Sequence, residues 1–306
     1  MKAKLVLITL AWVATYSSAS ACAICGCGVG NYYFGIMPQF HKNFVGLRYR
    51  NYSYTSHIGA GYKPFEATHE TFSSAELWAR FYPTKRIQLV TILSYSFNTQ
   101  VDQGVTKDIQ GVGDIPIFVN YNILNTNNQP LSEARVLNHN LLVGGGIKLP
   151  TGKYKYTEDP TQVANANFQL GTGSVDFMTN LLYTLRFKRF GLSVDATYKM
   201  NTANSNKYQF GNRASGTASV FYVQQIKKFG VMPNAGIYAE DSGKNKQYDI
   251  KIDNTGGAAT FASAGVETYY KNLSIGFNYQ SPMVQHLASN HSKAHDKVMV
   301  HVTFMF

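Results

Sequence analysis

The chain has few charged residues and no long hydrophobic run beyond its N-terminus. Lys, Arg, Asp and Glu make up 15% of the 306 residues, against about a quarter in a typical soluble domain. After residue 21 no stretch approaches the roughly 20 consecutive apolar residues of a membrane-spanning helix, and the mean hydropathy is only −0.19. These absences argue against an ordinary soluble domain and against a helical membrane protein.

Recognisable catalytic and nucleic-acid-binding patterns are also missing. The sequence contains neither G-x-S-x-G nor H-E-x-x-H, the motifs of common serine hydrolases and zinc proteases. The formal charge of +11 comes from 28 basic and 17 acidic residues, but the basic residues are scattered rather than gathered in a run, so we expect no nucleic-acid partner. We predict a protein that is not an enzyme.

Cysteine occurs only near the N-terminus, just after a segment typical of export. Residues 1–4 are basic, residues 5–14 are apolar, and Ala19-Ser-Ala21 forms a small-residue cleavage site. This is the pattern of a cleaved signal peptide. We therefore predict a signal peptide over residues 1–21, a cysteine-containing segment over 22–41 and a folded domain over 42–306.

Aromatic residues are abundant, with 21 Tyr and 19 Phe, and the C-terminal stretch shows strict alternation. From residue 298 every second side chain is apolar up to Phe306, while His301 and its alternating neighbours form a mixed face. An apolar strand at the edge of a soluble sheet is an aggregation hazard, whereas closing a barrel pairs both of its edges. A terminal strand ending in Phe also resembles the assembly signal of bacterial outer-membrane barrels.

The same alternation recurs along the chain and predicts twelve strands. They cover about 43–50, 75–82, 87–98, 115–123, 141–149, 175–186, 192–199, 214–226, 230–240, 259–270, 273–281 and 297–306. An even number of half-apolar strands is typical of a transmembrane antiparallel β-barrel of the bacterial outer membrane. The predicted fold class is therefore all-β, with the protein located in the cell outer membrane.

The predicted connections alternate in length. Short turns are expected near 83–86, 187–190, 227–229 and 270–272, with a longer connection over 125–138; long polar loops are expected at about 56–69, 100–112, 151–168, 201–213, 241–257 and 282–296. Short periplasmic turns and long outer loops are the layout of outer-membrane barrels. With twelve strands, Phe306 returns to the periplasmic side.

Charged residues fall on the mixed faces of the predicted strands. They are Arg48, Arg50, Glu76, Arg80, Asp114, Lys148, Asp176 and His301. Of these, Asp114, Lys148 and Asp176 lie near the outer ends of three consecutive strands, where a charge network is expected. In the dry core of a soluble β-sandwich, the alternative fold, each unpaired charge would cost several kcal/mol. We expect them to face a barrel lumen, where they either line a path or brace the wall.

Three motifs occur in order: residues 111–114 (GVGD), 144–152 (GGGIKLPTG) and 170–176 (LGTGSVD). Together they resemble the outer-membrane transporter family named after the meta-pathway of phenol degradation, a distant relative of channels of the fatty-acid-transporter type. The resemblance covers roughly residues 44–306. It implies a channel-like outer-membrane barrel and no catalytic residue.

Two clusters of potential metal ligands stand outside that resemblance. Cys22, Cys25 and Cys27 have a spacing that can wrap a soft ion such as Cu(I) or Zn(II), although a disulfide with one thiol left over, or lipidation of Cys22, explains them equally. His286, His291 and His295 lie in the last predicted loop. They predict capture of Cu or Zn, with scattered polar loop residues as the alternative.

The sequence thus predicts a passive outer-membrane channel for a small solute, with a link to copper or zinc through the cysteines. The expected partners are outer-membrane lipid, the barrel-assembly machinery and a small-molecule or metal solute. The alternatives are a metal-capturing or structural barrel without an open pore, and an outer-membrane lipase. A lipase requires a Ser–His pair on the membrane-facing surface, and the strand phases place His301 on the inner face.

Overall fold

The computed structural model describes residues 42–58, 63, 67–126, 137–154 and 166–306. The predicted signal peptide and the three cysteines lie outside these residues. Within them the protein is all-β apart from one turn of 3-10 helix at Ala288–Asn290. No helix of the described part is long and apolar enough to cross a membrane.

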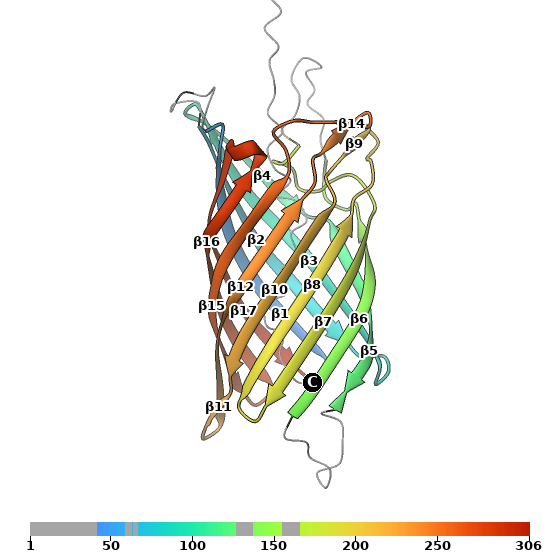
Figure 1. The fold of residues 1–306 in the computed structure, drawn as a ribbon, viewed down its shortest axis with the longest axis vertical. Coiled ribbons are helices and arrows are strands. Elements are labelled where there is room, and N and C mark those ends of the chain that lie inside the picture. Colours follow the sequence, from blue (N-terminus) through green and yellow to red (C-terminus); the bar gives the residue numbers. More distant parts are fainter. Residues whose placement is uncertain (1–41, 59–62, 64–66, 127–136, 155–165) are drawn as a thin grey trace, which may run out of the picture.

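Twelve of the described strands form the wall of a closed antiparallel barrel (Figure 1). They are β1 (Phe44–Ser56), β2 (Thr68–Phe81), β3 (Ile87–Asp102), β5 (Ile115–Asn125), β6 (Leu137–Leu149), β7 (Asp176–Phe187), β8 (Phe190–Met200), β10 (Arg213–Tyr222), β12 (Phe229–Ser242), β15 (Gly257–Tyr270), β16 (Leu273–Leu287) and β17 (Ser292–Met305). Each pairs with the next along the chain. The ring closes where β17 pairs with β1, for example His301 opposite Arg48. The predicted twelve-stranded barrel is confirmed.

The C-terminus lies at the end of the barrel that carries the short turns (Figure 1). The turns after β2, β7 and β15 each contain only a few residues, and two of them place a lysine, Lys188 or Lys271, at a positive φ. The Phe306 amide donates to the Asn43 carbonyl, at 2.9 Å, so the last residue is tied to the start of β1. As predicted, the even number of strands returns Phe306 to the end of the barrel that carries the short turns.

Two of the predicted long outer loops are wrong. Residues 100–112 continue β3 and return as β4 (Val105–Val112), and residues 282–296 extend β16 and β17 almost to their connection. β4 is short, its residues are all exposed or half-exposed, and Lys107 interrupts the face that carries Val105 and Ile109, so it lacks the repeated apolar face that marked the other strands. The backbone ladder of hydrogen bonds nevertheless continues, because it does not depend on side-chain polarity.

Two other predicted loops contain short strands. A small separate sheet consists of strands β9 (Tyr208–Gln209), β13 (Lys246–Gln247) and β14 (Ile250–Lys251). At the short-turn end, β11 (Gln224–Ile226) extends the hairpin that leads into β12. The small sheet stands above the ends of β8 and β12 (Figure 1). Tyr208, which belongs to β9, packs against Phe210. The outer end is therefore partly built of regular structure.

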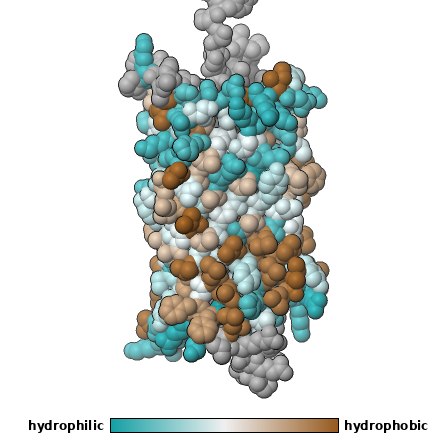
Figure 2. All heavy atoms as spheres, viewed as in Figure 1, coloured by the Kyte–Doolittle hydropathy of each residue, from teal (hydrophilic) through white to brown (hydrophobic). Residues whose placement is uncertain are grey.

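Aromatic side chains on the outer surface gather near both ends of the wall. Exposed aromatic residues toward the short-turn end are Phe81, Phe187, Phe190, Phe229, Tyr270, Phe304 and Phe306; those toward the other end are Tyr49, Tyr95, Phe97, Phe177, Tyr198 and Tyr279. Such paired girdles mark the two interfaces of a membrane barrel. Figure 2 shows hydrophobic residues concentrated in the lower half of the visible face and hydrophilic ones along its upper end.

The inner surface carries two apolar layers. The layer nearer the short turns includes Phe44, Trp78, Phe118 and Met305, and the outer layer is dominated by aromatic rings such as Tyr52, Phe72 and Phe261. Phe168, from the segment before β7, joins the outer layer and lies against Phe72. Charged side chains of the inner wall lie between and beside these layers.

Candidate functional site

The inner-facing charges of β1 and β2 form one compact group. Arg48 and Glu76 are directly opposite in the strand register, and the Arg48 Nε donates to Glu76 Oε2 at 2.6 Å. Arg50, one step along the same face, lies 2.8 Å from the other carboxylate oxygen. One glutamate therefore holds two guanidinium groups, and because all three side chains face inward the group projects a net positive charge into the lumen.

His301 and Glu267 form a second group beside the first. The His301 Nε2 lies 2.9 Å from Glu267 Oε1, and both side chains are buried. The Trp78 ring lies edge-on to the imidazole at 5.2 Å and carries the Arg48 guanidinium over its face at 5.0 Å. The predicted inward orientation of His301 is confirmed, and its partner Glu267 was not predicted.

Glycine makes room for these side chains on the wall. A Cβ at Gly276 would collide with Glu267 and His301, and a Cβ at Gly46 would lie 2.6 Å from the Trp78 Nε1. The imidazole and the indole therefore lie flat across the two glycine positions. Their orientation depends on backbone positions that carry no side chain.

Several polar atoms around His301 are buried and have no hydrogen-bond partner among the described residues. They are the Trp78 Nε1, Ser274 Oγ, Thr303 Oγ1, Glu267 Oε2 and His301 Nδ1. Thr303 is opposite both Ser274 and Gly46 in the register, so these atoms come from adjacent inner positions. Leaving such a group unsatisfied costs about 1–3 kcal/mol each. The arrangement suits a surface that binds water or a polar solute.

Lys148 is the centre of a third group, in which the three sequence motifs meet. Its ammonium lies 2.7 Å from Asp114 Oδ2 and 2.9 Å from Asp176 Oδ2, and its side chain is 0% exposed. The predicted network of these residues is therefore present. Its geometry is that of a brace, because one buried cation joins β6, β7 and the residue before β5.

Backbone and hydroxyl donors complete this brace. Asp114 accepts hydrogen bonds from the amides of Gly152, at 3.0 Å, and Thr172, at 2.9 Å. Asp176 accepts from the Ser174 hydroxyl at 2.8 Å and from the Thr202 amide at 3.1 Å. Thr172 also contacts the Lys148 ammonium. The motif residues thus tie the segment before β7 to the barrel wall.

Other inner charges were not among the predicted site residues. Lys297 donates to Glu240 at 3.0 Å, and its ammonium lies over the Phe261 ring at 3.9 Å. Lys199 and Arg213 are directly opposite and both buried. Asp195 faces the buried Thr217 across the same strand pair. Inward phase on β8, β10 and β12 was the signal that could have identified them.

Arg80 does not contact Glu76, although both face the lumen as predicted. Its guanidinium lies over the Phe44 ring at 4.6 Å and donates to the Lys42 carbonyl. Arg80 is four residues beyond Glu76 on the same face, about 13 Å along a strand, which is too far for contact with its carboxylate. It closes the short-turn end instead.

The three predicted histidine ligands lie apart. His286 contacts Asn290, His291 contacts the Ile58 carbonyl, and His295 contacts Thr55. Across the residues that the structure describes, no three His, Cys, Asp or Glu side chains converge as metal ligands. The prediction that includes Cys22, Cys25 and Cys27 falls outside those residues and stays a prediction.

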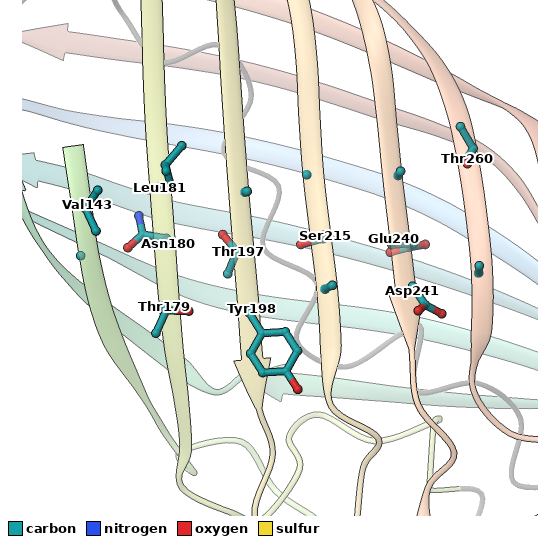
Figure 3. A pocket seen from close by; sticks show the side chains of 16 residues that line it. Val143, Thr179, Asn180, Leu181, Thr197, Tyr198, Ser215, Glu240, Asp241 and Thr260 are labelled. Atoms are coloured by element: carbon teal, nitrogen blue, oxygen red, sulfur yellow. The ribbon is translucent and has the colours of Figure 1, made fainter. Parts of the chain in front are cut away.

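A hollow of about 680 Å³ lies on the outer surface of the wall, not in the lumen. Figure 3 shows its lining side chains on β6, β7, β8, β10, β12 and β15. The lining residues with the membrane-facing phase include Leu181 and Tyr198, which are exposed, together with small residues such as Ala214 and Ala239. Most of its lining residues therefore have the membrane-facing phase, although the buried Asn180, Thr197 and Glu240 also contribute.

No family model matches the sequence, and the comparison with curated proteins finds no match. Among solved structures, the chain is similar to the COG4313 outer membrane channel from Pseudomonas putida F1, at 12% identity and a TM-score of 0.62, covering 90% of this chain and 100% of that one. It is also similar to the β domain of the Bordetella autotransporter BrkA, at 10% identity and a TM-score of 0.53, covering 87% and 100%. At these identities the similarity shows the fold, an outer-membrane β-barrel.

Proposed function

We propose that the protein is a channel of the bacterial outer membrane through which a small solute passes passively. The fold it shares with an outer membrane channel supports a channel role in general. The resemblance of its three motifs to the transporter family of the meta-pathway of phenol degradation points the same way. The proposed solute is a small molecule that can form hydrogen bonds.

The observation that carries the proposal is the set of unpartnered polar atoms around His301. An indole N–H, two hydroxyls, an imidazole nitrogen and a carboxylate oxygen face inward without a partner among the described residues. A sealed apolar core would leave each of them at a cost of about 1–3 kcal/mol. These atoms are buried, so water or a polar solute that enters between the side chains removes that cost.

The inner charges suit an uncharged or dipolar solute rather than an ion of one sign. The inner wall of the described barrel carries at least seven acids, Glu70, Glu76, Asp114, Asp176, Asp195, Glu240 and Glu267, and at least seven bases, Arg48, Arg50, Arg80, Lys148, Lys199, Arg213 and Lys297. Their net charge is close to zero when all are ionised. A balanced wall gives little discrimination between cations and anions.

Liposome swelling tests this proposal directly. Proteoliposomes diluted into isotonic solutions of uncharged sugars of increasing size should swell for the smallest sugars and cease to swell above a size limit. Lipid-only vesicles and vesicles carrying heat-denatured protein are the controls. Equal rates for protein and lipid-only vesicles would contradict the proposal.

A structural barrel without an open pore is the second candidate, and one observation favours it. Lys148 is completely buried and paired, so the charged group at the centre of the three motifs is packed rather than open to a path. The same swelling experiment separates the two candidates, because a closed barrel is impermeable to every sugar.

We further propose that the protein has no enzymatic activity. His301 faces the lumen and is paired with Glu267, whereas an outer-membrane lipase acts on lipid at its outer surface. A phospholipase assay on the detergent-solubilised protein tests this. Lipid hydrolysis that co-purifies with the barrel, and that is lost when a single serine is substituted, would contradict this proposal.

A further inference from the structure

Histidines are concentrated at the outer rim formed by β1, β2, β16 and β17. His57, His69, His286, His291 and His295 all lie at the outer ends of these strands. The rim is several residues beyond Tyr49, the nearest exposed aromatic residue of the upper girdle on β1. These imidazoles are therefore placed above the membrane interface and face the external medium.

Two of them aim at the same point. The His69 Nδ1 lies 3.1 Å from the Thr55 hydroxyl, and the His295 Nε2 lies 2.7 Å from that same hydroxyl oxygen. Thr55 is opposite His69 in the register, while His295 comes from β17 on the other side of β1. The two ring nitrogens thus converge from both sides of one strand.

We propose that His69 and His295 form a binding site for a divalent transition metal ion, with Cu²⁺ bound most tightly and Zn²⁺ less so. Imidazole nitrogens bind these ions at about 2.0–2.1 Å, so the ion takes the place between the two rings that the Thr55 hydroxyl fills in the metal-free state, and that hydroxyl turns aside on binding. Among the first-row divalent ions Cu²⁺ has the highest affinity for such ligands. Two protein ligands leave the remaining positions to water, which suits capture of an ion from solution.

Neutral imidazole nitrogens bind metal ions, and one ring of the pair is open to the medium. The His69 side chain is exposed, so an ion reaches the pair without rearrangement of the barrel.

The proposal does not depend on an open pore, so it stands or falls separately from the channel function. It also differs from the predicted set of His286, His291 and His295, because only His295 is shared and His69 replaces the others. The Thr55 hydroxyl links the two rings in the metal-free state. It is not required as a ligand.

The test is a Cu²⁺ titration of the purified, tag-free full-length barrel, followed by calorimetry and by electron paramagnetic resonance. The same titration on a variant with all three N-terminal cysteines replaced by serine removes any contribution of thiols. We expect one high-affinity site whose spectrum shows coupling to two nitrogens. His69→Ala and His295→Ala should each weaken binding by at least about tenfold, since even loss of an outer-shell partner costs 10–100-fold.

Two further variants separate a built site from adventitious binding. His286→Ala is the matched control, because this exposed rim histidine contacts only Asn290 in the described structure, and it should leave the affinity unchanged. Thr55→Ala removes the side-chain atoms that fill the place between the two rings and should retain binding. Unchanged affinity in His69→Ala and His295→Ala, or an equal loss in His286→Ala, would overturn the proposal.

Discussion

Replacing Lys148 by methionine should destabilise the folded barrel by about 3–5 kcal/mol, the usual cost of removing one partner from a buried ion pair. The reason is that Lys148 is 0% exposed and neutralises both Asp114 and Asp176, at 2.7 and 2.9 Å. Methionine fills a similar volume and cannot supply the charge. Amide and hydroxyl donors to both carboxylates remain, so the lower part of that range is expected, roughly a 150-fold change in the folding equilibrium.

The assay is reversible unfolding in urea of protein folded into lipid vesicles, followed by tryptophan fluorescence. Trp78 is the only tryptophan outside residues 1–21, and it lies inside the barrel, so its emission reports closure of the wall. Lys85→Met, in an exposed turn, is the matched control and should change stability by less than about 0.5 kcal/mol.

A compensating variant makes this prediction sharper. Combining Lys148→Met with Asp114→Asn and Asp176→Asn removes the uncompensated charges and should recover most of the lost stability. A loss below about 1 kcal/mol in the single variant, or no recovery in the triple variant, would refute the brace at Lys148.

Three further predictions concern the wall, the C-terminus and the N-terminal cysteines. Gly276→Ala should cost about 1–3 kcal/mol by overpacking, because the new methyl group meets Glu267 and His301; urea unfolding measures it, and Gly230→Ala, with only ordinary contacts, should be neutral. Deletion of Phe306, which bonds to Asn43, should lower the yield of folded, heat-modifiable barrel in cells before any effect on transport; normal assembly would contradict this. Serine at positions 22, 25 and 27 should abolish a Cu or Zn site in titrations under reducing conditions, and unchanged affinity would rule out the thiol site.

The alternation of apolar and polar residues was sufficient to predict most of the fold, because it shows directly which face of a strand contacts lipid. The phases of β1 and β17 place Leu47 and Val302 outward and Arg48 and His301 inward, and the structure agrees. Alternation says nothing where both faces of a strand are wet. That is why β4, a short strand in which polar and apolar residues are mixed and nearly all are exposed, was expected to be a loop.

The pairing of inner charges was only partly predictable. Asp114, Lys148 and Asp176 sit in recognisable motifs at the same ends of consecutive strands, which made their meeting foreseeable. Glu267 lies on β15 and His301 on β17, so their ion pair spans β16. It depends on the absence of a side chain at Gly276, which lies between them. Register between strands fixes such pairs, and a single sequence does not specify register.

The convergence of His69 and His295 illustrates the same limit. These residues are separated by more than two hundred positions in the sequence, and they meet only because β17 closes the barrel against β1. Spacing along the chain favoured His286 and His291 instead. Closure of the ring therefore decides which histidines are neighbours.

Single-channel recording in a planar lipid bilayer tests the proposed channel most directly. Folded protein should produce discrete current steps, and in a KCl gradient the reversal potential should lie near zero because inward acids and bases are balanced. Glu76→Gln, which leaves Arg48 and Arg50 without their shared carboxylate, should shift the reversal potential toward anion preference. Folded barrel that inserts into the bilayer and yields no current above that of lipid would contradict the channel and establish a closed barrel.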